Sequence, residues 1–237
     1  MERLRFSFAR KKSLAYVSHL DMLRLFLRAL RRSSLPLAYS QGYNPHPRIT
    51  LALPLPLGVT ASEELGEIYF AETIGPEKFL DLLGRQLPES LELLGAVSAK
   101  PELPSLASKV SAAHYRVFIS GGSDPAIKED ELREALEGLL AKEEILMERQ
   151  GKKKKTTCLN VRPYIFEAAL LSEENRPLEL SLILKAGSSG GVSPFFILGR
   201  LETENDPVSF NVQDWHVHRE KLYAEQNGIL QPLSEGM

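Results

Sequence analysis

The alternation of apolar and polar residues predicts the elements of the first hundred residues. Between Arg3 and Phe8 every second residue is apolar, which predicts a half-buried strand with a basic outer face. Leu20, Leu23, Leu27 and Leu30 recur at spacings of three and four, which predicts the apolar stripe of an amphipathic helix. The remaining predicted elements are strands at 36–40, 49–53, 65–72 and 91–99 and a helix at 76–87.

If the strands at 36–40 and 49–53 count as one interrupted element, the order is strand, helix, strand, strand, helix, strand. This is the ferredoxin-like order. The second half repeats it loosely, with strands at 114–120, 144–149, 156–169, 178–185 and 208–217 and helices at 126–142 and 194–201. We therefore expect an α+β protein of tandem ferredoxin-like (βαββαβ) lobes with antiparallel sheets. The expected domains are an N-terminal lobe at 1–100, a Pro-rich linker at 101–109 and a C-terminal lobe at 110–237.

Charge is distributed unevenly along the chain. The 237 residues carry a net charge of −2, but residues 1–60 contain ten Lys/Arg and only two acidic residues, a net of +8, so the remainder carries −10. This asymmetry indicates an anionic partner for the N-terminal part.

Four arginines recur on the predicted basic helix: Arg24, Arg28, Arg31 and Arg32. Their planar guanidinium groups bind phosphate oxygens bidentately, so their density suits a nucleic-acid backbone. Ser18 is placed to cap the helix, as in a capping box. A solvated helix face explains the same pattern without any ligand.

The loop from Gln41 to Arg48 has an unusual composition. Two prolines stiffen it, and it presents Tyr43, Asn44, His46 and Arg48. An aromatic ring, an amide and basic groups together suit base stacking and phosphate contact. Alternatively, the segment is a turn in which His46 bonds to a backbone group.

Three side chains raise the question of catalysis. His46, His19 and Tyr43 could supply the general base and acid for metal-independent RNA cleavage by the 2′-hydroxyl. Alternatively, His19 only caps the helix and His46 only binds RNA. Because no spacing brings the two histidines together, we assign no catalytic residue.

Other polar groups in the second half favour structural roles. His216 and His218 are two residues apart, but Asp214 is their only nearby further ligand, so we expect no metal site. Lys152–Lys155 is typical of a solvated basic turn, and Arg219 is expected to extend a basic surface.

The single cysteine, Cys158, excludes an internal disulfide and an iron–sulfur cluster held by this chain alone. No phosphate-binding glycine loop or dinucleotide fingerprint occurs, so we expect no cofactor. No apolar stretch approaches 18 residues and no signal peptide is evident, so we expect a cytoplasmic protein that does not bind membranes.

Several motifs resemble a known family. LRFSF, followed by YVSHLDMLRLFLRALRRSSLPLAYSQGYNPHPRITLALPLPLGVTASEE, is similar to the uncharacterised radical-SAM-linked protein family, whose members are fused to or encoded beside a cobalamin-binding radical SAM protein. NVRPYI, the Gly187–Pro194 turn and HREKLY fit the same family. The resemblance implies a bacterial cytosolic protein that works with a radical SAM partner in RNA-related metabolism.

A more distant likeness is to CRISPR repeat-processing endoribonucleases of the tandem ferredoxin-like kind. Here, however, the glycine loop precedes the last predicted helix, whereas in that class it follows a helix.

These observations lead to one function and two alternatives. We expect a non-catalytic RNA-binding accessory protein that works with a radical SAM enzyme in tRNA or rRNA metabolism. The alternatives are a metal-independent endoribonuclease and a protein-binding adaptor for the radical SAM partner.

Overall fold

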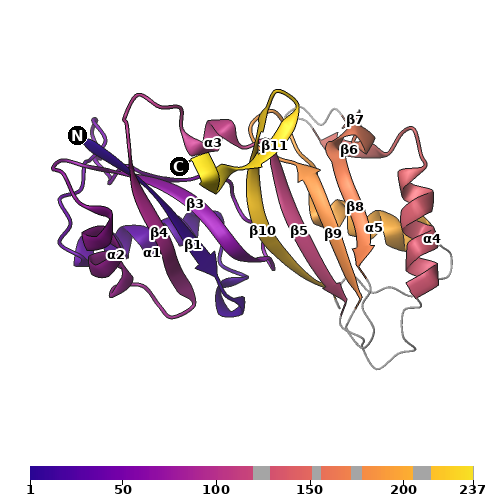
Figure 1. Ribbon diagram of the computed structural model, residues 1–237, viewed down its shortest axis with the longest axis horizontal. Helices are drawn as coiled ribbons and strands as arrows, with labels where there is room; N and C mark the ends of the chain where they lie inside the picture. Colours follow the sequence, from indigo (N-terminus) through magenta and orange to yellow (C-terminus); the bar gives the residue numbers. More distant parts are fainter. Residues whose placement is uncertain (120–128, 151–155, 172–177, 205–214, 237) are drawn as a thin grey trace. The chain divides into compact units, whose positions relative to one another are not determined.

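The protein is a mixed α+β chain whose paired strands are mostly antiparallel (Figure 1). The computed structural model describes residues 1–119, 129–150, 156–171, 178–204 and 215–236. Its contacts divide the chain into two compact units. The first unit contains Met1–Ala112 and Arg219–Met237, and the second contains Ala113–His218. The domains expected at 1–100 and 110–237 concern which parts of the chain fold independently, and they stay predictions.

The first unit begins with the predicted order of elements. This order is β1 (Glu2–Arg10), α1 (His19–Arg32), β2 (Ile49–Leu51), β3 (Thr60–Phe70), α2 (Pro76–Gly84) and β4 (Leu91–Ala99). Strand β1 lies between β4 and β3, and β2 pairs with the other side of β3. The strand expected at 36–40 is reduced to two isolated bridges, between Leu37 and Phe70 and between Tyr39 and Pro47. Strand β10 (Trp215–Gln226) also lies beside β3, and β11 (Ile229–Pro232) pairs with β10.

Aromatic rings fill the core between α1, α2 and one face of these strands. Phe6 and Phe8 of β1 lie 5.6 and 5.1 Å, between ring centroids, from Phe26 of α1. Phe6 also contacts Phe79 of α2. Gly66 lies opposite Phe6, where an added Cβ would come within 2.4 Å of the Phe6 ring. The absence of a side chain at residue 66 therefore makes room for the central ring of this core.

Of the predicted leucine stripe of α1, only Leu30 belongs to the face that the core buries. The fully buried residues are Met22, Phe26, Ala29 and Leu30, whereas Leu20 is 64% exposed. Both sets of residues fit a helical period. Contact with the Phe6 and Phe8 rings places Phe26 inward and leaves the start of the leucine stripe outside.

The other face of β1 is buried too, so the expected basic outer face is wrong. Arg3 and Arg5 are at most 1% exposed. Arg5 Nε donates to Glu67 Oε1 of β3 at 3.0 Å. The remaining guanidinium N–H groups of both arginines donate mainly to backbone carbonyls, those of Lys100, Leu103 and Pro104.

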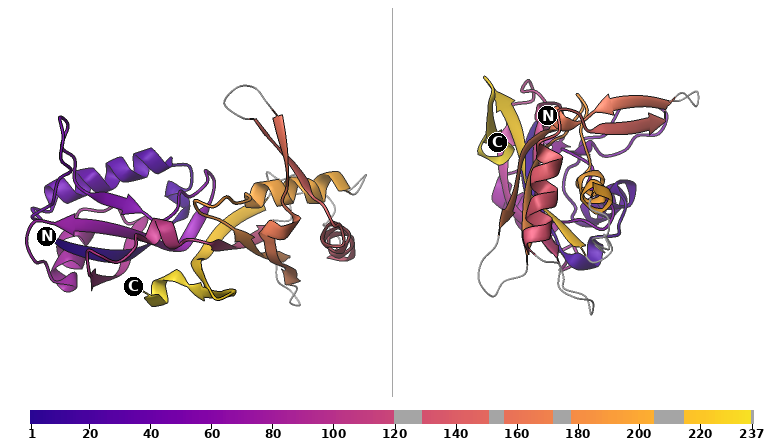
Figure 2. Two further views of the ribbon diagram at one scale, coloured as in Figure 1. Left: turned by 90° about the horizontal axis from the view of Figure 1, so that it is seen from above. Right: turned by 90° about the vertical axis from the view of Figure 1, so that its right-hand side faces the viewer.

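The stretch expected to be a linker supplies two of those carbonyls, those of Leu103 and Pro104. It covers the Arg3 and Arg5 face of the sheet and includes α3 (Leu106–Lys109), whose Leu106 is buried. Arg5 Nη1 also donates to the carbonyl of Gly236 at 3.4 Å. Figure 2 shows α1 on one side of these strands and the C-terminal segment, in yellow, on the other.

Arg219 of β10 is fully buried, which contradicts the expectation that it extends a basic surface. Its Nε donates to Glu64 Oε1 of β3 at 2.7 Å, and its Nη2 donates to Glu64 Oε2. Further bonds reach the carbonyls of Leu53 (3.1 Å) and Pro54 (3.3 Å). The ion pair is therefore surrounded by acceptors that satisfy the guanidinium in the absence of water.

The second unit contains one sheet with helices and a separate hairpin. Its elements are β5 (Ala112–Ile119), α4 (Glu129–Leu140), β6 (Leu146–Gln150), β7 (Thr156–Asn160), β8 (Ile165–Leu171), β9 (Glu179–Lys185), α5 (Pro194–Glu204) and the first residues of β10. The strands are ordered β10-β5-β9-β8, and β6 pairs only with β7 among the described strands. The extended stretch expected at 156–169 is thus two strands in two sheets. Part of the strand expected at 208–217 lies outside the described residues.

The buried ion pair gives a stability prediction. We expect Arg219→Met to lower the free energy of unfolding by about 3 kcal/mol, because it leaves the Glu64 carboxylate buried without its bidentate partner. Urea denaturation measures this change. The matched control is Arg85→Met, which removes an exposed ion pair with Asp81 and is expected to cost less than about 1 kcal/mol. Equal stability losses in the two variants would contradict the prediction.

Candidate nucleic-acid interface

Helix α1 begins where Ser18 caps it, as the sequence predicts. Asp21 N donates to Ser18 Oγ at 3.2 Å, and Ser18 Oγ donates to Asp21 Oδ2 at 2.7 Å. The hydrogen bond from Ser18 is the main cause that lowers the pKa of the Asp21 carboxyl, and the bond from Arg24 also contributes. A negative charge in the first turn is favourable at the positive end of the helix dipole.

The four arginines expected to bind phosphate are exposed on α1. They are Arg24, Arg28, Arg31 and Arg32, and we call them the arginine face. Arg24 Nη1 lies 2.8 Å from Asp21 Oδ1. Within the described part of the chain, Arg28 and Arg31 form no ion pair with a carboxylate. Their N–H donors are therefore available for the oxygens of a phosphate group.

A groove of about 440 Å³ lies beside the arginine face. Arg32 Nη2 donates to the backbone carbonyl of Gln86 at 2.7 Å, which connects α1 to the segment between α2 and β4. The groove is lined by Asp21, Leu25, Arg28, Arg32, Gln86 and Pro88. Sequence reasoning missed Gln86 and Pro88, because only the fold brings them to the helix.

The loop after α1 projects its polar residues into solvent. Ser40 N donates to the carbonyl of His46 at 2.9 Å, which closes the loop at its base. Gly42 has a φ of +131°, a conformation that L side chains rarely adopt, and Tyr43 beside it is fully exposed. Asn44 is exposed as well. The ring and the amide at the tip of the loop are therefore accessible to a ligand.

His46 and Arg48 have partners within the protein. His46 Nδ1 lies 3.1 Å from Ser40 Oγ and 3.3 Å from the Asn44 carbonyl, and the residue is exposed. The Arg48 guanidinium stacks over the Tyr69 ring at 3.9 Å from its centroid. The Tyr69 ring of β3 thus fixes the plane of the Arg48 guanidinium.

His19 lies in a different environment from His46. It lines a small pocket with Arg10, Glu64 and apolar side chains, and neither His46 nor Tyr43 lines that pocket. Burial lowers the pKa of His19, and the opposing charge of Glu64 only partly offsets this effect. Arg10, which is itself buried, donates to carbonyls of the turn before α1, including that of Val17 at 2.7 Å. Sequence reasoning did not foresee the proximity of Glu64 to His19.

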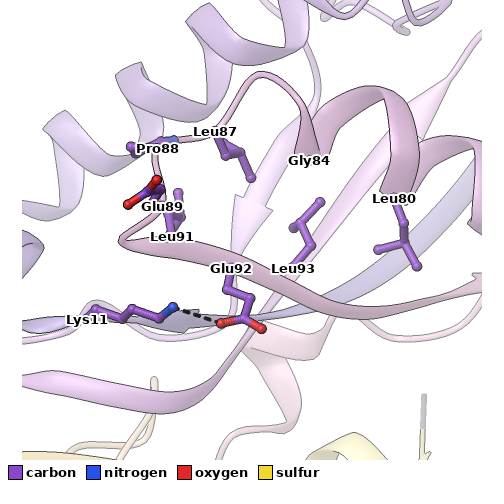
Figure 3. A pocket seen from close by; sticks show the side chains of 9 residues that line it. All are labelled: Lys11, Leu80, Gly84, Leu87, Pro88, Glu89, Leu91, Glu92 and Leu93. Atoms are coloured by element: carbon purple, nitrogen blue, oxygen red, sulfur yellow. Dashed lines mark ion pairs between the residues drawn. The ribbon is translucent and has the colours of Figure 1, made fainter.

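A second hollow, of about 630 Å³, lies between α2 and the start of β4 (Figure 3). Leucines line much of it, together with Glu89 and Glu92. Lys11 Nζ lies 3.0 Å from Glu92 Oε2, so its charge is neutralised within the hollow. Carboxylates repel phosphate, and we therefore do not include this hollow in the candidate interface.

The remaining sequence candidates lie in the second unit or outside the described residues. His216 lies on β10 with its ring near that of Phe118, and His218 is on the same strand. Asp214 and Lys152–Lys155 are not among the described residues. Among those that are described, no group of three or more His, Cys, Asp or Glu side chains could hold a metal ion. None of the described helices is long and apolar enough to cross a membrane.

Comparison with known proteins identifies the family. The model of a family described as "Uncharacterized protein conserved in bacteria (DUF2344)" matches residues 3–194. The chain belongs to DUF2344. No curated protein matches it.

Among solved structures, the chain is similar to one titled "Crystal Structure of a Cbf5-Nop10-Gar1 Complex", with 10% identity and a TM-score of 0.47. The match covers 97% of this chain and 60% of that one, so this chain spans about three fifths of the other's length.

The pocket around His19 gives a prediction about pH. The pKa of His19 is lower in the folded protein than its usual value of 6.5, so the unfolded state binds more protons as the pH falls through that value. His19 therefore makes the protein less stable at pH 5.5 than at pH 7.5. We expect His19→Gln to reduce this loss in urea denaturation measured at both pH values.

The matched control is His46→Gln, which removes an imidazole outside the His19 pocket and leaves the contribution of His19 in place. A His19→Gln variant with undiminished pH dependence would show that His19 does not cause the loss.

Proposed function

We propose that this member of DUF2344 is a non-catalytic RNA-binding accessory protein that works with a radical SAM enzyme in tRNA or rRNA metabolism. The observation that carries the proposal is the arginine face of α1, in which Arg28 and Arg31 are exposed and without a carboxylate partner in the described chain. Because these two arginines have no ion pair to break within the described residues, their binding to an anionic polymer costs little free energy.

The burial of other arginines refines the charge argument. Arg3, Arg5 and Arg10 contribute to the positive balance of residues 1–60, but they are buried and bonded within the protein. The charge available to a partner is therefore concentrated on α1 and its neighbouring turns. A charge concentrated on one helix supports a local contact with a phosphate backbone.

The loop adds groups that can contact RNA bases, which RNA recognition needs in addition to phosphate contacts. A fully exposed ring at Tyr43 suits stacking on an unpaired base, and the Asn44 amide suits hydrogen bonding to a base edge. The stacked guanidinium of Arg48 is oriented by Tyr69. These groups support a site for structured RNA with unpaired nucleotides.

A non-catalytic role is favoured over RNA cleavage by the separate surroundings of the two histidines. General acid–base cleavage requires two groups within reach of the same ribose. His19 faces Glu64 and Arg10, whereas His46 bonds to Ser40. The endoribonuclease therefore remains the weaker alternative.

The radical SAM partner and the ferredoxin-like lobes are further parts of the proposal. The partner rests on the resemblance carried by the SHLD and GYNPHP motifs. The strand neighbours β4-β1-β3-β2 in the first unit and β10-β5-β9-β8 in the second support two lobes of this kind, with β6 and β7 as an inserted hairpin.

The arginine face can be tested by charge reversal. We expect Arg28→Glu with Arg31→Glu to weaken binding of bulk tRNA by roughly 10-fold or more at low salt, because phosphate contacts are lost and repulsion is introduced. The salt dependence of binding should also become less steep. Fluorescence anisotropy at 50 and 200 mM salt measures both quantities.

The matched control is Arg85→Glu with Arg133→Glu, which makes the same change in net charge at two exposed arginines outside α1. Unchanged tRNA binding in the Arg28/Arg31 variant would remove the basis for the proposal. It would favour the adaptor if the same variant lost an RNase-insensitive complex with the radical SAM protein. Cleavage of RNA in EDTA that His46→Ala abolishes would favour the endoribonuclease instead.

A further inference from the structure

Among the described residues of the second unit, the sheet has one buried face and one face with several partly exposed side chains, which we call the open face. On β9, Leu180, Leu182 and Leu184 are fully buried, and their neighbours along the strand point the other way. Strand β5 alternates in the same manner, with Tyr115 and Val117 buried. Figures 1 and 2 show α5 on one side of these strands. The side of a sheet that packs against a helix is its buried side, so the leucines belong to the α5 side and the alternate residues to the open face.

The open face gathers planar side chains. His114, Arg116 and Phe118 are alternate residues of β5 and are all partly exposed. His216 and His218 lie on the neighbouring strand β10 and are also partly exposed. Three of the five histidines of the chain therefore share one face of one sheet.

Two rings and a guanidinium lie next to each other at the centre of this face. The Phe118 and His216 rings are nearly parallel, with 24° between their planes and 6.3 Å between their centroids, so they lie side by side across two strands. The Arg116 guanidinium lies 5.2 Å from the Phe118 ring centroid. We call these three side chains the stacking platform.

Glu179 fixes the guanidinium of the stacking platform. Arg116 Nη2 donates to Glu179 Oε2 at 2.6 Å, and Arg116 Nε donates to Glu179 Oε1. Glu179 is nearly buried, whereas the Arg116 side chain is 39% exposed. A bidentate pair of this kind sets the plane of the guanidinium, which can then stack with little further loss of entropy.

An adjacent polar group makes the surface unlike a purely apolar docking site. His114 Nε2 lies 2.9 Å from the Oγ of Ser181, which is buried, so the partly exposed imidazole of His114 is the polar group beside the stacking platform. Planar π groups bordered by hydrogen-bonding groups match the chemistry of unpaired nucleobases, which stack on aromatic and guanidinium planes.

We propose that the open face of the second unit binds single-stranded RNA by stacking bases on Phe118, His216 and Arg116. This inference rests on the proposed function in taking RNA as the ligand, but it involves none of the residues of the arginine face. It adds a place for unpaired bases in the second unit to the Tyr43 loop and the phosphate-binding arginine face of the first.

The test uses the full chain and a ten-nucleotide single-stranded RNA of mixed sequence. We expect Phe118→Leu with His216→Leu to weaken its binding about 5- to 100-fold, because stacking is lost while apolar volume is retained. The dependence of binding on salt should be unchanged. Phe118→Trp, which keeps an aromatic plane, should bind like the wild type. Phe166→Leu is the matched control, since Phe166 is an exposed ring elsewhere in the same unit.

The outcomes separate this inference from the proposed function. If the platform variant binds the oligonucleotide as tightly as the wild type while the Arg28/Arg31 variant loses tRNA, the inference is overturned and the proposed function stands. If the wild-type protein binds neither RNA, both are overturned.

A measurement on the wild-type protein covers the case in which the double variant does not fold. Stacking of a base should shift the ring-proton NMR signal of His216 upfield on addition of the oligonucleotide, with His216→Gln used for assignment. An unshifted signal at saturating oligonucleotide would overturn the inference.

Discussion

The first unit depends on arginines that are buried between paired strands and covering segments. Arg219 bonds to Glu64, and Arg5 bonds to Glu67, so each ion pair joins a strand to β3. Because an isolated buried charge costs several kcal/mol, the carbonyls of residues 53–54 and 100–104 must also be in place. These bonds tie the C-terminal strand and the stretch after β4 to the N-terminal sheet.

This constraint separates two kinds of arginine that look alike in the sequence. Arg5, Arg10 and Arg219 on β1 and β10 direct their donors at carboxylates and carbonyls inside the protein, so they stabilise the fold. Those on α1 lie on the face opposite Phe26, where Arg28 and Arg31 form no ion pair with a carboxylate among the described residues. Only the second kind can meet an anionic partner, and the proposed function follows from this division.

The sequence predicts the parts that depend on local patterns. The Ser18 cap, the order of elements up to β4 and the exposure of the α1 arginines all follow from period and capping chemistry. The alternation at Arg3 and Arg5 predicts two faces correctly, but it cannot predict that residues 100–104 and the C-terminus cover the polar face. Likewise, the neighbours of His19 and of Arg32 come from positions far along the chain, and only the fold brings Glu64 and Gln86 to them.

Chemical modification of arginine tests the division between the two kinds of arginine most directly. The protein is treated with phenylglyoxal with and without bound tRNA, and mass spectrometry identifies the modified arginines. The account predicts that Arg28 and Arg31 react quickly in the free protein and are protected by tRNA, while Arg3, Arg5 and Arg219 stay unmodified in both states. Rapid modification of the buried arginines in the folded protein, or equal reactivity of Arg28 and Arg31 in both states at saturating tRNA, would contradict it.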